Sequence, residues 1–125
     1  MEKQRIAIIG LGRIGSAFLR QLLERMNDGI ELVCVAESAE TAGRQLAQKA
    51  GIKICTLDGV VAMGPRIHVI FELTGLPEVR RELREKLVNS KNDETVIASE
   101  SIARVIWALI SDGSLPMIAG RPTGY

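Results

Sequence analysis

Apolar residues along the chain follow two kinds of pattern. In the first, a run is almost continuously apolar and rich in β-branched residues, which is typical of strands covered on both faces of a sheet. Five runs have this pattern, at residues 5–10, 30–36, 52–57, 67–75 and 94–99. They are predicted to be five β-strands.

In the second pattern, apolar residues recur every three or four positions, which is the spacing of one helix face. Four such stripes predict helices: Ile14, Ala17, Phe18, Leu22 and Met26; Ala42, Leu46 and Ala50; Val79, Leu83 and Leu87; and Ile102, Val105, Ile106 and Leu109. Ser38 is expected to cap the second helix and Gly51 to end it. Pro77 suits the first turn of the third helix.

Because strands and helices alternate, the predicted fold class is α/β. We expect a single doubly wound domain over residues 1–114, with a parallel sheet of five or six strands and helices on both faces. The expected strand order is 3-2-1-4-5, which places a ligand crevice beside the first strand, where the order reverses. Residues 115–125 have no clear period and are expected to form a tail or arm, with a second subunit as one candidate contact.

Composition narrows the classes of partner. Apolar residues make up 46% and charged residues 25% of the 125 residues, which is ordinary for a globular domain. The net charge of +1 and the aromatic content of 3% argue against nucleic acid as a partner. No apolar stretch approaches the ~20 residues of a membrane span, and the N-terminus lacks a signal-peptide pattern. The expected location is therefore cytoplasmic, without a membrane partner.

The two cysteines lie in strand-like runs. Cys34 and Cys55 could sit on neighbouring strands, which leaves a disulfide open, but buried reduced thiols are favoured for a chain without an export signal. With one histidine and two widely spaced cysteines, no metal site is expected.

Three glycines fall where the first strand gives way to the first helix. The segment Gly10-Leu11-Gly12-Arg13-Ile14-Gly15 is a full G-x-G-x-x-G, preceded by a strand pattern and followed by an amphipathic helix. In this context the first glycine permits the turn, the second lets a diphosphate approach the main chain, and the third lets the helix pack on the strand. The segment predicts a dinucleotide held at a helix N-terminus.

An acidic residue follows the second strand. Glu37, with Ser38 beside it, lies 22 positions after Gly15, where a carboxylate can accept hydrogen bonds from the adenosine ribose and repel a 2′-phosphate. NAD is therefore expected as the cofactor, with NADP less favoured. Arg44 is expected to lie too far into the next helix to clamp a phosphate. A glycine turn and a surface glutamate without any ligand remain the alternative.

These segments resemble known families. "IAIIGLGRIGSAFLRQLL" followed by "VCVAES" resembles the N-terminal nucleotide domain of NAD(P)-dependent dehydrogenases, which has a Rossmann fold. The homoserine and aspartate dehydrogenases are the nearest types, and "GLGRIG" is also similar to glyceraldehyde-3-phosphate and 2-hydroxyacid dehydrogenases. "IHVIFELTGLPEV" supports the comparison, which implies that Thr74 and Gly75 lie beside the cofactor. The resemblance implies less about Glu72 and Pro77.

A second resemblance concerns small Rossmann-like modules that precede some bacterial signalling proteins. "VCVAES", "FELTG" and "SIARVIWALI" are similar to three segments of those modules. This resemblance implies a sensor rather than a catalyst.

Few side chains at the expected ligand edge suit catalysis. The residues predicted there include no histidine, cysteine, lysine or tyrosine, and His68 is expected at the opposite edge of the sheet. Hydride transfer usually needs a positioned acid or base. Ser99 or Ser101 is most simply a helix cap. We therefore expect no catalytic residue.

Three functions remain open. The first is an NAD(H)-binding module without a catalytic domain of its own, a sensing or regulatory unit that reports redox state to a partner protein or to the neighbouring subunit of a homodimer. The second is the nucleotide domain of a homoserine or aspartate dehydrogenase-type enzyme whose catalytic part is missing or on another chain. The third is a Rossmann-like scaffold that has lost its cofactor or uses another nucleotide.

Overall fold

The computed structural model describes residues 3–26 and 29–110. Strands and helices alternate along the chain as the apolar pattern predicts. The strands are β1 (Gln4–Ile9), β2 (Ile30–Ala36), β3 (Lys53–Cys55), β4 (Val69–Glu72) and β5 (Val96–Ala98). The helices are α1 (Arg13–Arg25), α2 (Ala42–Lys49), α3 (Leu57–Ala62), α4 (Pro77–Asn89) and α5 (Glu100–Ile110), with a short 3₁₀ turn η1 (Gly64–Arg66) before β4.

The five strands form one parallel sheet in the order β3-β2-β1-β4-β5, which confirms the predicted order. β1 lies at the centre, and the sheet extends to opposite sides of it through β2 and β4. The order therefore reverses at β1, and the carboxyl ends of all five strands lie along one edge.

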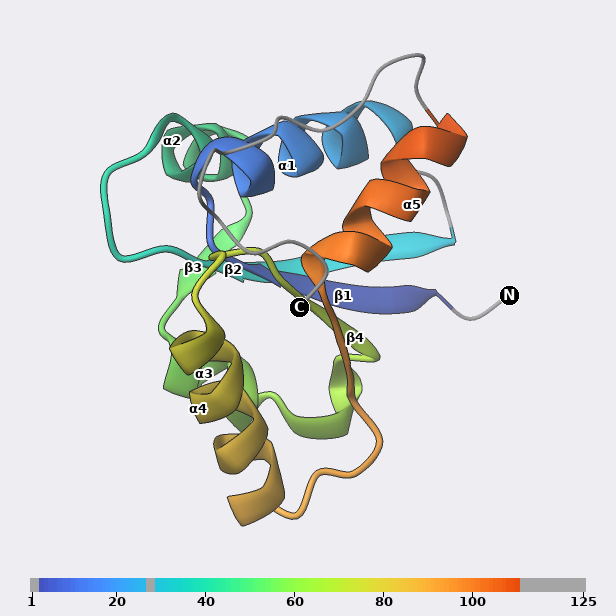
Figure 1. Ribbon diagram of the computed structural model, residues 1–125. Coiled ribbons are helices and arrows are strands. Elements are labelled where there is room, and N and C mark those ends of the chain that lie inside the picture. Colours follow the sequence, from blue (N-terminus) through green and yellow to red (C-terminus); the bar gives the residue numbers. More distant parts are fainter. Residues whose placement is uncertain (1–2, 27–28, 111–125) are drawn as a thin grey trace.

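Helices cover both faces of the sheet (Figure 1). On one face, α1, α2 and α5 pack over a core that includes Ile8, Phe18 and Phe71, and the two phenylalanine rings lie 5.0 Å apart. On the other face, α3 and α4 pack over a core that includes Ile70 and Leu83. Successive strand residues contribute to opposite cores, which explains why the strands are apolar at nearly every position.

Near β3, two predicted element boundaries differ from those in the structure. The third run was expected to be a strand over 52–57, but β3 ends at Cys55, and the Thr56 side chain accepts a hydrogen bond from the Gly59 N–H at 3.0 Å. This cap begins α3, which the sequence pattern missed because six residues are too few for a periodic stripe. The segment before β4 therefore holds a helix and a 3₁₀ turn where a short connection was expected.

The expected cap of the second helix was also wrong. Thr41, rather than Ser38, precedes α2, and its hydroxyl accepts a hydrogen bond from the Arg44 N–H at 3.0 Å. Ser38 instead belongs to the exposed turn that leaves β2. The fourth and fifth strands are likewise shorter than predicted at both ends, and helix α5 begins two residues after the end of β5.

The apolar stripe that predicted α5 faces solvent in part. Ile102, Val105 and Leu109 are exposed, whereas Ala103 is buried and Ile106 packs only partly against the core. The helix itself is confirmed, but α5 is apolar on nearly all sides, so that its apolar spacing does not single out the buried face.

Within residues 3–26 and 29–110, no helix is long and apolar enough to cross a membrane. The same residues hold no group of three or more histidine, cysteine, aspartate or glutamate side chains placed to bind a metal ion. The predicted tail or arm at 115–125 lies outside the described residues.

Candidate functional site

A cavity of about 760 Å³ opens at the carboxyl edge of the sheet, beside the end of β1. Its walls come from the β1–α1 corner, the end of β2, the β3–α3 corner and the turn that leads from β4 into α4. This volume falls in the range of sites that hold small molecules and cofactors. The cavity therefore lies at the place that the strand order predicts for a ligand.

The β1–α1 corner depends on two glycines. Gly10 has φ of +96°, and a Cβ there would lie 2.8 Å from the Thr74 main-chain nitrogen. A Cβ on Gly15 would lie 1.8 Å from the Gly10 carbonyl oxygen. Both positions therefore exclude a side chain, and together they let α1 start against the end of β1.

Gly12 has a different role from its two neighbours. A Cβ built there would meet nothing within 4 Å, so the fold itself leaves room for a side chain. Gly12 is the N-cap residue of α1 and provides no side-chain cap. The first turn of α1, whose residues are all described, contains no acidic residue. The N–H groups of that turn, at the positive end of the helix dipole, therefore lie at the cavity wall without a side-chain cap.

Arg13 and Ile14 follow Gly12 in the cavity wall. Arg13 is exposed and brings a positive charge to the same corner, whereas the Ile14 side chain is buried in the core. The corner thus combines bare main chain, a helix N-terminus and one guanidinium, a donor set that suits a diphosphate.

Glu37, at the end of β2, is held in place by two main-chain donors. Its Oε1 accepts a hydrogen bond from the Leu11 N–H at 2.7 Å, and its Oε2 accepts one from the Ala39 N–H at 3.1 Å. The carboxylate therefore links the glycine loop to the turn after β2. Because each oxygen keeps a further lone pair, the carboxylate can still accept hydrogen bonds from ligand hydroxyl groups.

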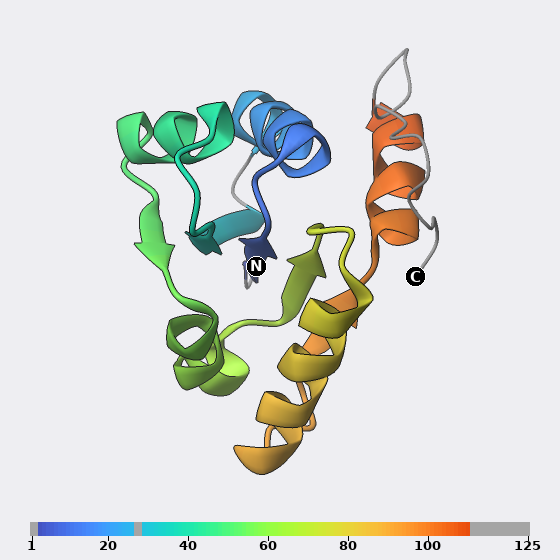
Figure 2. The same ribbon diagram turned by 60° about the vertical axis from the view of Figure 1, so that its left-hand side comes forward.

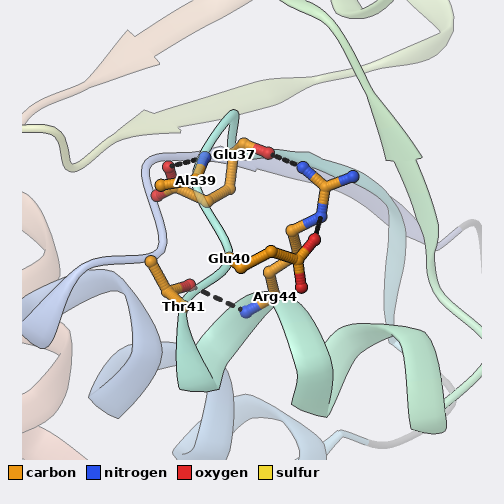
Figure 3. Close-up of polar contacts among 5 residues, drawn as sticks. All are labelled: Glu37, Ala39, Glu40, Thr41 and Arg44. Atoms are coloured by element: carbon orange, nitrogen blue, oxygen red, sulfur yellow. Dashed lines mark hydrogen bonds and ion pairs between the residues drawn. The ribbon is translucent and has the colours of Figure 1, made fainter.

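Arg44 lies beside Glu37, contrary to the prediction. Figure 3 shows its guanidinium donating to the main-chain carbonyl of Glu37 and pairing with Glu40, whose Oε1 lies 3.3 Å from the Arg44 Nε. Arg44 also lines the cavity. Arg44 was expected farther away because the helix was predicted to begin near Ser38, whereas Thr41 caps α2 and leaves Arg44 in the first turn.

The turn after β4 closes the cavity on the other side of β1. Thr74 lines the cavity; its N–H donates to Glu72 Oε1 at 3.0 Å, and its hydroxyl also donates to Oε1. The Thr74 hydroxyl in turn accepts a hydrogen bond from the Leu76 N–H at 3.1 Å. Glu72 is fully buried, so it acts as an internal anchor for this turn.

The structure brings most of the predicted binding residues together. Seven of the ten line the cavity: Gly10, Gly12, Arg13, Ile14, Glu37, Ser38 and Thr74. The other three support it from behind. Leu11 is buried and contributes only its N–H, Gly15 packs on Gly10, and Gly75 makes the turn with φ of +76°.

One part of the cavity wall, on the side of α3 and α4, was not predicted from the sequence. Ile54, Cys55, Val79 and Glu82 line the cavity there. Cys55 was expected inside a strand, so the prediction of a ligand edge without cysteine was wrong; the early end of β3 brings it to the edge. Val79 belongs to the apolar stripe that predicted α4, and it is only partly buried.

The two cysteines are reduced and lie on neighbouring strands. Cys34 is opposite Lys53 and Cys55 is opposite Ala36, so the cysteines are two register positions apart. Strand spacing and rise then separate their Cα atoms by roughly 8 Å, beyond the ~7 Å limit for a disulfide. Burial, and secondarily the neighbouring Cys55, raise the pKa of Cys34 to about 12.

His68 lies away from the cavity, at the amino end of β4. Its Nδ1 accepts a hydrogen bond from the Arg5 N–H at 2.8 Å, which joins the entry of β4 to β1. The prediction that it lies at the opposite edge is confirmed. Ser99 directly precedes α5, and its carbonyl oxygen accepts the first hydrogen bonds of that helix.

Comparison with protein families identifies the class of protein. The model of the family described as "NADP oxidoreductase coenzyme F420-dependent" matches residues 5–99, which is more than half of the chain. The chain belongs to this family. It is an NAD(P)-binding Rossmann domain, similar to the nucleotide-binding domain of dehydrogenases. A comparison with curated proteins finds no significant match.

Several solved structures share the fold. Homoserine dehydrogenase from S. aureus has a TM-score of 0.57 and 21% identity, over 90% of this chain and 30% of that one. Homoserine dehydrogenase from Thiobacillus denitrificans has a TM-score of 0.56 and 24% identity, over 88% and 26%. Prephenate dehydrogenase from A. aeolicus, solved with hydroxyphenyl propionate and NAD⁺, has a TM-score of 0.57 and 17% identity, over 80% and 34%. The chain thus spans about a third or less of these relatives.

Proposed function

We propose that this chain is an NAD(H)-binding module that senses or reports the redox state of the nucleotide and has no catalytic residue of its own. The single observation that carries the proposal is the open N-terminus of α1 in the wall of the 760 Å³ cavity. Gly12 leaves space there that the fold does not use, and Arg13 supplies a positive charge. A diphosphate would satisfy the free N–H groups of the first turn.

The remaining contacts of the dinucleotide follow from the walls of the cavity. In this proposal Glu37 and Ser38 lie beside the adenosine ribose, because they follow the strand next to the glycine loop. Thr74 and Gly75 lie on the other side of β1, where the nicotinamide half would extend. Bound nucleotide supplies a hydride acceptor or donor; the residues of this chain bind and orient it.

NAD is proposed over NADP because of the fixed charge of Glu37. Two main-chain N–H groups hold its carboxylate in the cavity wall, where it would repel a 2′-phosphate. Two observations favour NADP instead: Arg44 lines the cavity near Glu37, and the description of the family names NADP. However, the Arg44 guanidinium is already bound to Glu40 and to the Glu37 carbonyl, contacts that a 2′-phosphate would have to replace.

A second candidate is the nucleotide domain of a homoserine dehydrogenase-type enzyme. It is favoured by the shared fold over about 90% of this chain. In that case this chain binds the nucleotide, and residues outside it bind the substrate. A natural reading frame that continues past Tyr125 into a substrate-binding domain would support this candidate and contradict the proposed module.

Thermal unfolding in the presence of NAD⁺, NADH, NADP⁺ and NADPH tests the proposal. A ligand at a hundred times its Kd adds about 2.7 kcal/mol to the free energy of unfolding, which clearly raises the melting temperature. We expect NAD⁺ and NADH to stabilise the protein more than NADP⁺ and NADPH at equal concentration. No stabilisation by any of the four would favour the scaffold that has lost its cofactor.

Glu37→Gln and Arg44→Gln form a matched pair of variants for the choice of nucleotide. Glu37→Gln keeps the size of the side chain and removes its charge, and we expect the ratio of NAD to NADP affinity to fall about tenfold. Arg44→Gln should leave NAD binding in place. If NADP binds better than NAD, and if Arg44→Gln abolishes that preference, Arg44 rather than Glu37 determines the specificity.

A further inference from the structure

Two threonines line the cavity, and their hydroxyl groups have different capacities left for a ligand. A threonine hydroxyl has one proton to donate and two lone pairs that accept. Thr56, at the β3–α3 corner, accepts the Gly59 N–H at 3.0 Å, and it donates to none of the described residues. The Thr56 hydroxyl therefore keeps its proton for a ligand.

The hydroxyl of Thr74 has no proton left. Thr74 belongs to the turn at the tip of β4, from which the chain leads into α4 (Figure 2). Its hydroxyl donates to Glu72 Oε1, and one of its lone pairs accepts the Leu76 N–H at 3.1 Å. A single lone pair remains. The Thr74 hydroxyl can therefore accept a hydrogen bond from a ligand but cannot donate one.

Contacts with both branches of the Thr74 side chain fix its orientation. The methyl branch lies against the glycine loop, since a Cβ built on Gly10 would be 2.9 Å from Thr74 Cγ2. The hydroxyl branch is held by Glu72 and by the Leu76 N–H. A β-branched side chain has few χ1 rotamers, and these contacts select one of them. The acceptor therefore has a fixed place in the cavity wall, next to the glycine loop.

Glu72 holds Thr74 at a cost to the fold. Its Oε1 accepts both the hydroxyl and the N–H of Thr74, the latter at 3.0 Å. The side chain is fully buried, and none of the residues 3–26 and 29–110 donates to its Oε2. A buried carboxyl oxygen without a partner is unfavourable, and an apolar side chain would avoid that cost. An apolar side chain, however, could not take the proton of Thr74.

We propose that Glu72 is a positioning residue, which makes the Thr74 hydroxyl an acceptor for a hydrogen-bond donor on the nicotinamide half of the bound nucleotide. This inference rests on the proposed function, because it concerns the same cavity. The donor is a hydroxyl of the nicotinamide ribose or the carboxamide N–H₂ group. A phosphate oxygen has no proton to offer, so Glu72 directs the diphosphate to the N-terminus of α1 and away from the turn after β4.

Calorimetric titration with NAD⁺, ADP-ribose and ADP tests the acceptor. Thr74→Val keeps the shape of the side chain and removes the hydroxyl, so the affinity for NAD⁺ should fall about tenfold. The affinity for ADP, which lacks both donors, should change less than about twofold. ADP-ribose has the ribose hydroxyls but no carboxamide. A loss for ADP-ribose equal to that for NAD⁺ supports the proposal with ribose as the donor, and an unchanged affinity supports it with the carboxamide as the donor.

Thr74→Ser keeps the hydroxyl and should bind NAD⁺ within about threefold of the wild type. Glu72→Gln tests the positioning role, because the glutamine amide can donate to the Thr74 hydroxyl and release its proton. We expect the affinity for NAD⁺ to fall about threefold or more, with ADP binding unchanged. Since Glu72 acts through this hydroxyl, Glu72→Gln should cost nothing further in the Thr74→Val protein. Additive losses, or equal losses for NAD⁺ and ADP, would overturn the proposal.

Thr56→Val is the matched control, since it removes the hydroxyl of the other cavity threonine. It should leave the ratio of NAD⁺ to ADP affinity unchanged, although it also removes the cap of α3. A wild type that binds both nucleotides, with the same ratio in Thr74→Val, would overturn this inference and leave the proposed function intact. A wild type that binds neither nucleotide would overturn both.

Discussion

Helices α1 and α2 begin at the same edge of the sheet, yet their N-termini are built in opposite ways. At α2, the Thr41 hydroxyl accepts the Arg44 N–H, so the protein caps its own helix. Thr56 does the same for α3. At α1, Gly12 occupies the corresponding position and has no side chain to offer. Helix α4 also begins at this cavity without a side-chain cap, but its first turn holds Pro77 and the acidic Glu78, whereas the first turn of α1 holds neither, so the α1 end is the one that suits an anion.

Glu37 links the glycine loop before the uncapped helix α1 to the turn before the capped helix α2. It accepts one N–H from the glycine loop and one from the turn before α2, so the position of the loop depends on the carboxylate that would also contact ribose. The open corner is thus organised by the same residue that is proposed to select the nucleotide.

Gly15→Ala should have the largest effect, because the added methyl group disrupts the close packing of α1 against the end of β1. The new Cβ would lie 1.8 Å from the Gly10 carbonyl oxygen, so the backbone of β1 or α1 must move. We expect the free energy of unfolding to fall by about 3 kcal/mol or more. Urea unfolding measures it. A loss below about 1 kcal/mol would show that the corner can adapt and is not rigid.

Thr41→Ala should have a smaller effect on stability, confined to the capped N-terminus of α2. Loss of the side-chain cap costs about 1 kcal/mol of stability. Nucleotide affinity should stay close to that of the wild type, because the Thr41 side chain caps α2 and does not line the main cavity. Urea unfolding and calorimetry together check both parts. A large loss of affinity would contradict the distinction between the two corners.

Alkylation of the cysteines should give the smallest but most local effect. Cys55 lines the cavity, whereas Cys34 is buried and its pKa is raised to about 12. Since the thiolate is the reactive form, Cys34 should react little at pH 8. NAD⁺ should slow the reaction of Cys55, as followed by mass spectrometry. Equal rates with and without NAD⁺ would place the nucleotide away from the α3 side of the cavity.

A raised thiol pKa also makes stability depend on pH. Below pH 9 the Cys34 thiol is protonated in both the folded and unfolded states, so its ionisation does not lower the free energy of unfolding. Between pH 9 and about 12 the unfolded chain loses this proton first, so stability falls, by up to about 1.4 kcal/mol per pH unit. Cys34→Ala should flatten this part of the decline in urea unfolding. An identical slope in the variant would contradict the assigned pKa.

The sequence predicted those features that depend on local chemistry. Continuous apolar runs identified every strand, and the spacing of Gly10, Gly12 and Gly15 identified the corner and its cavity. Helix starts were less predictable, because Ser38 and Thr41 are both good caps and only the path of the chain chooses between them. Because Thr41 rather than Ser38 caps α2, Arg44 lies in the first turn of the helix and lines the cavity.

Features that depend on packing between distant segments were not predictable. The apolar spacing of α5 could not show which side meets the sheet, because nearly every side is apolar. The role of Cys55 depended on where β3 ends, which the Thr56 cap decides. In both cases, the contact that decides the outcome cannot be predicted from the spacing of apolar residues.

The most direct test of the open α1 N-terminus is calorimetric titration of NAD⁺ into the wild type and Gly12→Ala. A Cβ at this position meets nothing in the protein, so stability should change by no more than about 1 kcal/mol. The same Cβ would occupy the space proposed for the diphosphate, so the Kd for NAD⁺ should rise about tenfold or more. Equal affinity of the two proteins, or no binding of NAD⁺ by the wild type, would contradict the account.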